Sequence, residues 1–187
     1  EASKKIYAAK GRPSDNPLIL HIADMEQFYP LIKTDNEKII ARAEALADVF
    51  WPGPLTMILP KADNIPYETT GGLDTVAIRM PSHLVARALL QECKMPIAAP
   101  SANLSGRPSP TSASHVIEDM NGRIEMIIDS GDVGIGVEST IIDLTGEVPM
   151  LLRPGFVTPE MLKDVLGAIE TDAAVYRQVG KDVHPKA

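Results

Sequence analysis

The stretch TVAIRMPSHLVARALLQECKMPIAAP (residues 75–100) holds a strand pattern, a helix pattern and a second strand pattern in direct succession. The first run is rich in β-branched and apolar residues and ends at a proline, which is typical of a strand. Ser82 can cap a helix through HLVARALLQECK, in which Val85, Ala88 and Leu89 share one face. PIAAP then predicts a further strand. Alternation of this kind is typical of α/β proteins.

The same patterns continue in both directions along the chain. We expect further helices over residues 1–10, 36–50, 111–122 and 159–167 and further strands over residues 18–22, 55–60, 124–129, 139–144 and 149–154. Strands that alternate with helices and then cluster indicate a mixed parallel and antiparallel sheet flanked by helices. The chain after Gly167 lacks periodicity. We therefore expect one α/β domain over residues 1–167 and a linker over residues 168–187.

Composition excludes several classes of protein. The 187 residues carry a net charge of -7, which argues against a surface that coats nucleic acid. No apolar run approaches the roughly 20 residues of a membrane span, so we expect no membrane partner. The single cysteine, Cys93, cannot form an internal disulfide and favours a cytoplasmic setting; we expect it to be buried in a helix.

Common catalytic and cofactor motifs are missing from the sequence. It contains no phosphate loop of the G-x-x-x-x-G-K-[ST] type, no G-x-G-x-x-G after a strand, no H-E-x-x-H and no G-x-S-x-G. Its four histidines are far apart in the sequence and predict no metal site. The chemistry must therefore come from other polar residues.

Polar residues open, interrupt, close or follow several predicted strands, and others lie at the end of the first predicted helix. They are Lys10, Arg12, Asn16, Arg79, Ser101, Asn103, Ser139, Thr140 and Arg153. In open α/β sheets, ligands bind in the crevice beyond the strand ends. A cleft with this many cations would hold a triphosphate or a carboxylate, which guanidinium groups bind in a bidentate manner.

Most of these residues also have a structural interpretation. Lys10 and Arg12 can complement the dipole of a helix end and solvate a turn. Ser101 and Asn103 can form a hydroxyl or Asx turn. His21, within the apolar run LILHI, can be a hydrogen-bonded core histidine.

Arg79 interrupts the apolar run VAIRM, where an unpaired charge would be costly to bury. It must therefore either form a structural ion pair or face a ligand cavity. Ser109 and Thr75 are weaker candidates by themselves. The residues alone leave both interpretations of Arg79 open.

Six segments in this order give a more specific prediction. They are KIYAAKGRPSDNPLILHI, WPGPLTMIL, TVAIRMP, PIAAPSANLSGRPSPT, GVESTIIDL and LLRPG, and they extend from residue 5 to about residue 155. Together they resemble the YrdC-like family of threonylcarbamoyl-AMP synthases. The resemblance implies a twisted mixed sheet around a deep, positively lined cavity.

The resemblance also implies an activity. Members of this family join L-threonine, bicarbonate and ATP into threonylcarbamoyl-adenylate and release pyrophosphate, with Mg²⁺ on the nucleotide. A downstream threonylcarbamoyl-transferase complex then modifies tRNA. The family has also been linked to double-stranded RNA, so tRNA or double-stranded RNA is a further expected partner.

Matching the family's motifs residue by residue implies a set of site residues. The catalytic set falls on Lys10, Arg12, Ser101 and Asn103. The ATP contacts fall on Arg12, Asn16, Thr75, Ser101, Ser109 and Arg153. The threonine contacts fall on His21, Arg79, Ala99 through its backbone, and Ser139, with Arg79 pairing the carboxylate. The resemblance implies no metal held by protein ligands.

The sequence differs from the family pattern at both ends. The family carries a P-T-E-T-x-Y-G-L strand and loop before the first helix, and this chain begins after it. The final KDVHPKA resembles the start of the linker that leads to a second domain in longer members. We therefore expect a fragment of the two-domain form.

Two alternatives remain at this point. Carbamoyltransferases of hydrogenase maturation contain a similar domain that uses carbamoyl phosphate, within chains that also carry acylphosphatase and zinc-finger segments. A non-catalytic RNA-binding module is the other, although aromatic residues for base stacking make up only 4% of the chain. Salt-sensitive tRNA binding without nucleotide turnover would favour this module.

Overall fold

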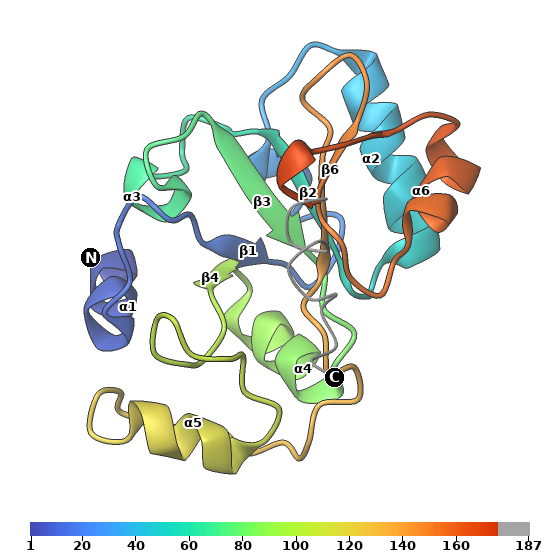
Figure 1. The fold of residues 1–187 in the computed structure, drawn as a ribbon. Helices are drawn as coiled ribbons and strands as arrows, with labels where there is room; N and C mark the ends of the chain where they lie inside the picture. The colour runs from blue at the N-terminus through green and yellow to red at the C-terminus, as the bar shows by residue number, and fades with distance from the viewer. Residues whose placement is uncertain (176–187) are drawn as a thin grey trace, which may run out of the picture.

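Seven strands form one mixed sheet in the computed structural model, which describes residues 1–175 (Figure 1). In chain order they are β1 (Ile19–His21), β2 (Leu55–Pro60), β3 (Thr75–Arg79), β4 (Ile97–Ala99), β5 (Thr140–Asp143), β6 (Met150–Arg153) and β7 (Glu170–Thr171). Their order across the sheet is β4-β1-β3-β2-β5-β6-β7. The pairs β1–β3, β2–β5 and β6–β7 are parallel and the other neighbours are antiparallel. The α/β mixed sheet expected from the sequence is confirmed.

Helices lie on both sides of this sheet. They are α1 (Ala2–Lys10), the short 3-10 helix η1 (Tyr29–Leu31), α2 (Glu37–Phe50), α3 (Tyr67–Thr70), α4 (Leu84–Cys93), α5 (Ala113–Met120) and α6 (Pro159–Leu166). Local signals fix their ends. The Asn36 side chain caps α2 by accepting from the Lys38 amide, and Thr158 caps α6 by accepting from the Met161 amide. Gly11 ends α1 with a φ of 60°, where glycine is favoured.

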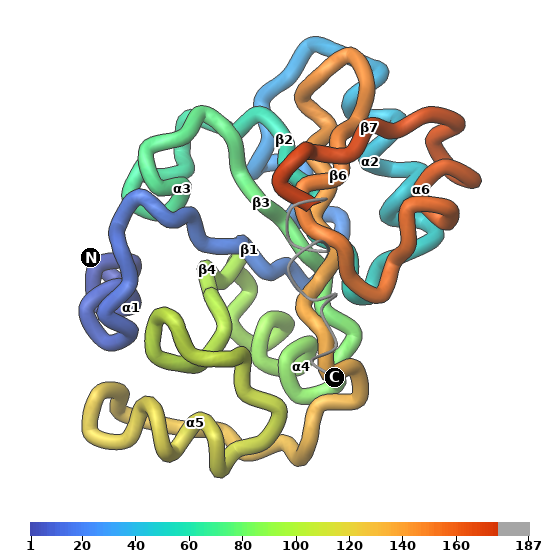
Figure 2. The backbone as a smooth tube through the Cα atoms, in the orientation of Figure 1, coloured from blue at the N-terminus to red at the C-terminus, as the bar shows by residue number. Residues whose placement is uncertain are grey.

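The hydrophobic core lies on one face of the sheet. Alternate strand residues such as Leu20, Met57 and Ile78 point to this face and are almost fully buried. Helices α2 and α6 pack against each other and cover it, and the tube in Figure 2 shows them side by side. This core holds the sheet and leaves its other face for different contacts.

The opposite face of the sheet carries the polar strand residues. His21 lies beside Arg79 in the parallel β1–β3 register, and Ala99 pairs with Ile19 across β1 and β4. Their neighbours in sequence, Leu20 and Ile78, are in the core, so the two-residue period directs His21 and Arg79 to the other face. Helices α4 and α5, with the loops around them, lie on this side (Figure 1).

Four expectations about secondary structure are wrong. His83, not Ser82, precedes α4, and it makes no side-chain cap. Residues 124–129 form no strand, and the exposed side chains of Met126 and Ile128 show that this apolar run has no sheet neighbour. Cys93 is exposed at the end of α4, because the last turn of that helix faces solvent.

The fourth concerns the chain after Gly167. The predicted linker begins too early, because Glu170 and Thr171 form β7 and pair with Met150 and Leu151 at the sheet edge. A two-residue strand is too short to produce a periodic pattern. Residues 176–187, the rest of the predicted linker, lie outside the described part of the chain. No helix within residues 1–175 has the length and apolar run needed to cross a bilayer.

Candidate active site

Two adjoining cavities open on the sheet face opposite the core. The sheet cavity, of about 670 Å³, is lined by His21, Arg79, Ala99 and Ser139 among others. The loop cavity, of about 680 Å³, is lined by Lys10, Arg12, Asn16 and Asn103 among others. Both are bounded by Ser101, Ser109, residues 136–138 and Arg153. Eleven of the twelve residues that sequence matching singles out therefore meet at one composite site.

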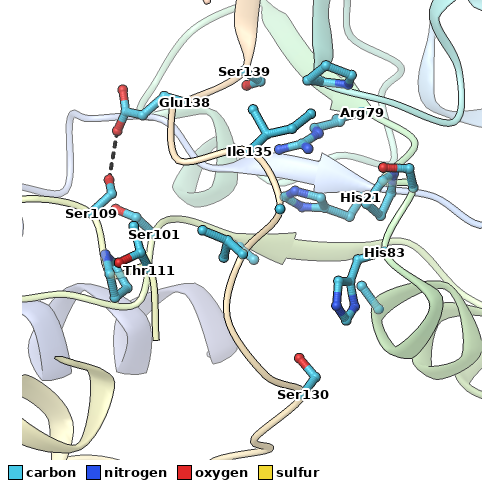
Figure 3. A pocket seen from close by; sticks show the side chains of 18 of the residues that line it. His21, Arg79, His83, Ser101, Ser109, Thr111, Ser130, Ile135, Glu138 and Ser139 are labelled. Carbon is cyan, nitrogen blue, oxygen red and sulfur yellow. Dashed lines mark hydrogen bonds between the residues drawn. The ribbon is translucent and has the colours of Figure 1, made fainter. Parts of the chain in front are cut away.

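Arg79 presents an uncompensated cation to the sheet cavity. Its Nε donates to the Gly53 carbonyl at 3.0 Å, and no carboxylate within residues 1–175 forms an ion pair with it. Burial lowers the pKa of Arg79, and the nearby Arg153 lowers it further. Figure 3 shows the guanidinium directed toward the same space as His21 and Ser139. Two repelling cations beside one cavity create a site that favours an anion.

His21 faces this cavity as a neutral ring. Its Nδ1 lies 3.1 Å from the Ile19 carbonyl, and because a carbonyl only accepts, Nδ1 carries the proton. Burial lowers the pKa of His21 to about 4, and Arg79 acts in the same direction. The ring is therefore an uncharged polar wall next to the Arg79 cation at neutral pH.

Ser139 and Arg153 are locked together where β5 and β6 meet. Arg153 donates from Nε to the Ser139 carbonyl and from Nη2 to Ser139 Oγ, both at 3.0 Å. Ser139 Oγ also lies 2.8 Å from the hydroxyl of Thr56 on β2. These contacts fix the Arg153 guanidinium on the wall that the two cavities share.

Lys10 and Asn103 form the interior of the loop cavity. Lys10 is only 3% exposed, and its ammonium donates to the carbonyls of Ser101 and Asn103 and to Asn103 Oδ1. The Asn103 amide donates to the Arg107 carbonyl at 2.6 Å. Burial lowers the pKa of Lys10. The positive charge of Arg12 lowers this pKa further, whereas the carboxylate of Asp119 opposes the change. The Ser-x-Asn turn is thus held by a buried lysine from α1.

Arg12 and Asn16 make the outer edge of the loop cavity. The Arg12 guanidinium donates to Asn16 Oδ1 and, at 3.1 Å, to the Pro17 carbonyl. Burial lowers the pKa of Arg12, and Glu138 partly opposes this change. An outward-facing guanidinium supported by carbonyl and amide oxygens remains available to an anion in the cavity.

Thr75 is the site candidate that the structure separates from the others. It starts β3, whereas Arg79 ends that strand, and it lines neither cavity. At about 3.3 Å per residue, the two positions are roughly 13 Å apart. Its predicted contact with ATP stays a prediction.

Two residues of the site were missed by the sequence reasoning. Glu138 accepts hydrogen bonds from Ser109 Oγ at 2.9 Å and from Arg153 Nη1 at 2.7 Å. Asp119, on α5, accepts from the Leu104 amide at 3.0 Å and from the Arg107 side chain. Glu138 precedes Ser139 in the segment GVESTIIDL, so its position beside a predicted site residue could have pointed to it. Asp119 lies within an ordinary helix pattern, which gives no indication of a role in the site.

The two cavities offer few protein ligands to a divalent metal. Within residues 1–175, no group of three or more histidine, cysteine, aspartate or glutamate side chains comes together. Glu138 is the one carboxylate among the described residues that line the cavities. Mg²⁺ usually keeps several waters and binds one or two carboxylates together with substrate phosphates. The site therefore fits Mg²⁺ that arrives on a polyphosphate.

A family model described as "Telomere recombination", which covers the Sua5, YciO and YrdC proteins, matches residues 1–155. The chain belongs to the Sua5/YciO/YrdC family. It is 57% identical to the threonylcarbamoyl-AMP synthase of Pyrococcus abyssi, over 97% of this chain and 52% of that protein. It is 53% identical to the Bacillus subtilis threonylcarbamoyl-AMP synthase, over 99% of this chain and 53% of that protein.

A solved structure of this family agrees with the fold. The crystal structure of P. abyssi Sua5 complexed with L-threonine matches with a TM-score of 0.89 and 57% identity. The match covers 94% of this chain and 50% of that chain. The family's fold is thus confirmed here, and this chain spans about half the length of the curated relatives it matches.

Proposed function

We propose that this member of the Sua5/YciO/YrdC family is the catalytic portion of a threonylcarbamoyl-AMP synthase. It would form threonylcarbamoyl-adenylate and pyrophosphate from L-threonine, bicarbonate and ATP. The observation that carries the proposal is the partly buried Arg79 guanidinium, which faces a cavity with no carboxylate partner among the described residues. A relative at 57% identity has been crystallised with L-threonine, which supports the same choice of ligand.

The sheet cavity suits the amino acid. Arg79 can bind the threonine carboxylate, because its outer nitrogens are not used in the contact with Gly53. The neutral His21 ring, the Ser139 hydroxyl and the Ala99 backbone offer uncharged polar groups to the rest of the threonine molecule. A neutral histidine adds no repulsion against the threonine ammonium.

The loop cavity suits the triphosphate. Arg12 and Arg153 supply the charge, Ser101, Ser109 and Asn16 supply hydroxyl and amide groups, and Lys10 with Asn103 holds the turn on which Ser101 lies. When bound, Mg²⁺ would neutralise part of the phosphate charge. Arg153 lines both cavities, so the bound threonine would lie next to the phosphates.

The reaction needs two steps. In the first, the deprotonated threonine nitrogen forms a bond to the carbon of carbon dioxide and releases a proton to solvent; from bicarbonate, the same bond forms with loss of water. The product is a carbamate. A carbamate oxygen then attacks the α-phosphorus of ATP, and the bond between that phosphorus and the oxygen leading to the β-phosphate breaks to release pyrophosphate. Arg12 and Arg153 stabilise the charge on the phosphates, and the cavities hold the reactants in line. The chain would then contribute positioning and electrostatics.

The product would pass to a downstream threonylcarbamoyl-transferase complex that acts on tRNA, in the cytoplasm. Residues 1–167, extended to β7 at Thr171, would be the catalytic domain, and a second domain would follow in the longer form. RNA contact would be secondary to catalysis.

The decisive experiment is pyrophosphate release from ATP with Mg²⁺ and bicarbonate, with and without L-threonine. We expect release to depend on threonine and to fall about 100-fold in Arg79→Ala, since a charge-assisted bidentate contact is lost. Arg42→Ala is the matched control, because the Arg42 side chain donates hydrogen bonds to the carbonyls of Gly146 and Glu147 and lines neither cavity. Release that follows carbamoyl phosphate instead of threonine would favour the carbamoyltransferase alternative and contradict the proposal.

A further inference from the structure

The carboxylate of Glu138 occupies the wall between the two cavities. Its Oε1 accepts from Ser109 Oγ at 2.9 Å, and its Oε2 accepts from Arg153 Nη1 at 2.7 Å. Figure 3 shows the contact with Ser109 at the cavity edge. Ser109 and Arg153 are both candidate nucleotide contacts. The Glu138 carboxylate therefore already accepts hydrogen bonds from the groups that a polyphosphate would use.

The charge of Glu138 also influences a third nucleotide candidate, Arg12. Burial lowers the pKa of Arg12, and Tyr7 and Glu138 both oppose this change. Ser109 and Arg153 thus share one carboxylate through hydrogen bonds, and Arg12 is influenced by its charge. Carboxylate and phosphate oxygens make the same charge-assisted hydrogen bonds with these donors, so the two anions compete for them.

The pair is not required to hold Arg153 in place. Arg153 keeps two further hydrogen bonds, both to Ser139, if the carboxylate leaves. The side chains of Glu138 and Arg153 are 50% and 31% exposed, and ion pairs of this exposure contribute little to stability. The contact can therefore be exchanged at low cost.

The backbone before Glu138 permits such an exchange. Residues 121–138 form no helix or strand, and a Cβ built at Gly134 or Gly136 would meet open space. Ser139, in contrast, is held by Thr56 and Arg153. The carboxylate thus projects from near the end of an irregular segment, next to Ser139, which is held in place just before β5 begins at Thr140.

We propose that Glu138 is a displaceable counter-ion, which fills the anion position on Ser109 and Arg153 until a polyphosphate takes its place. The identification of that polyphosphate as ATP rests on the proposed function, whereas the exchange itself does not. Because the displaced carboxylate stays close to the bound phosphates, it disfavours a polyphosphate without Mg²⁺ more than one whose charge is partly neutralised. Glu138 would then be a specificity-determining residue for the metal-complexed nucleotide.

The test is calorimetric titration of the 187-residue chain with inorganic pyrophosphate in EDTA at low ionic strength. Glu138→Gln keeps an acceptor for Ser109 and removes the charge, so we expect it to bind pyrophosphate about fivefold tighter than the unmodified chain. The gain should shrink as salt is added and be smaller when Mg²⁺ replaces EDTA. Asp63→Asn is the matched control, since it breaks an exposed ion pair with Lys33 away from both cavities and should change nothing.

Glu138→Asp, which keeps the charge, should bind more weakly than Glu138→Gln. Equal or weaker binding by Glu138→Gln in EDTA overturns the proposal, as does a failure of both this variant and the unmodified chain to bind pyrophosphate. A loss seen only with Mg²⁺ would make the carboxylate a metal ligand and also overturn it. If tighter pyrophosphate binding occurs while threonine-dependent release does not, the counter-ion stands and the proposed function fails.

Discussion

Burial and a neighbouring cation act together on the His21 side chain. Its ring lies beside Arg79 on the open face of the sheet, and both influences lower its pKa, to about 4. The same residue in an unfolded chain would titrate near pH 6.5. Folding therefore releases a proton from His21 in mildly acidic solution, and this couples the stability of the protein to pH.

The pH dependence of stability tests this arrangement. Between pH 6.5 and about pH 4 the unfolded state binds one more proton at His21 than the folded state, so stability rises with pH in this window and falls as the solution is acidified. We expect the unmodified chain to lose about 2–3 kcal/mol more unfolding free energy than His21→Gln between pH 7 and pH 4. Denaturant titrations of both proteins measure this difference, and parallel pH curves would contradict it.

The junction of β5 and β6 illustrates a constraint at the level of elements. Thr140 donates to the Val157 carbonyl at 2.7 Å, and Gly155 lies so close that a Cβ there would be 2.5 Å from the Glu138 carbonyl oxygen. These atoms belong to backbone and cannot move independently. The glycine thus permits the close approach that brings Arg153, Glu138 and Ser139 to the shared wall.

Gly155→Ala should therefore damage both the fold and the site. We expect a loss of about 1–3 kcal/mol of unfolding free energy from the forced shift, together with weaker pyrophosphate binding. Gly134→Ala, where the added methyl meets open space, serves as the control for stability. Chemical denaturation of the two variants checks the prediction, and equal midpoints would show that the junction is more adaptable than its contacts indicate.

Across the whole molecule, the loop cavity depends on segments far apart in sequence. Lys10 comes from α1, its acceptors come from the turn at Ser101 and Asn103, and Asp119 of α5 anchors the same turn through Leu104 and Arg107. The Ser105 amide returns to the Lys10 carbonyl at 3.0 Å. Three elements therefore have to be placed correctly before Ser101 can face a ligand.

Asp119→Asn should show this long-range dependence. Loss of the carboxylate leaves the Arg107 side chain and the Leu104 amide less firmly held, and we expect turnover to fall about 10- to 100-fold because the turn no longer presents Ser101 in one position. Pyrophosphate affinity should fall as well. Glu118→Gln is the control, since Glu118 also contacts Arg107, at 3.1 Å, but is 70% exposed. Equal turnover of the two variants would contradict a positioning role for Asp119.

Much of the secondary structure followed from short-range patterns. The apolar period predicts α2, and the apolar runs predict β2, β3, β5 and β6, because these signals lie within one element. The wrong prediction of a strand over residues 124–129 also came from a local pattern. Their apolar side chains resemble a strand locally, yet Ile128 lines the sheet cavity and has no strand beside it.

The candidate site, like the secondary structure, was predicted from local sequence patterns only in part. The amino-acid sequence by itself determined the α/β class and, through its resemblance to a family, predicted the polar residues of the candidate site, since both signals lie in short local patterns. Only the tertiary structure decided that Arg79 lacks a carboxylate partner within the described residues, that Lys10 holds the Ser101 turn and that Glu138 sits on Arg153. Charge pairing and burial depend on which distant segments come together, and a linear pattern does not contain those distances.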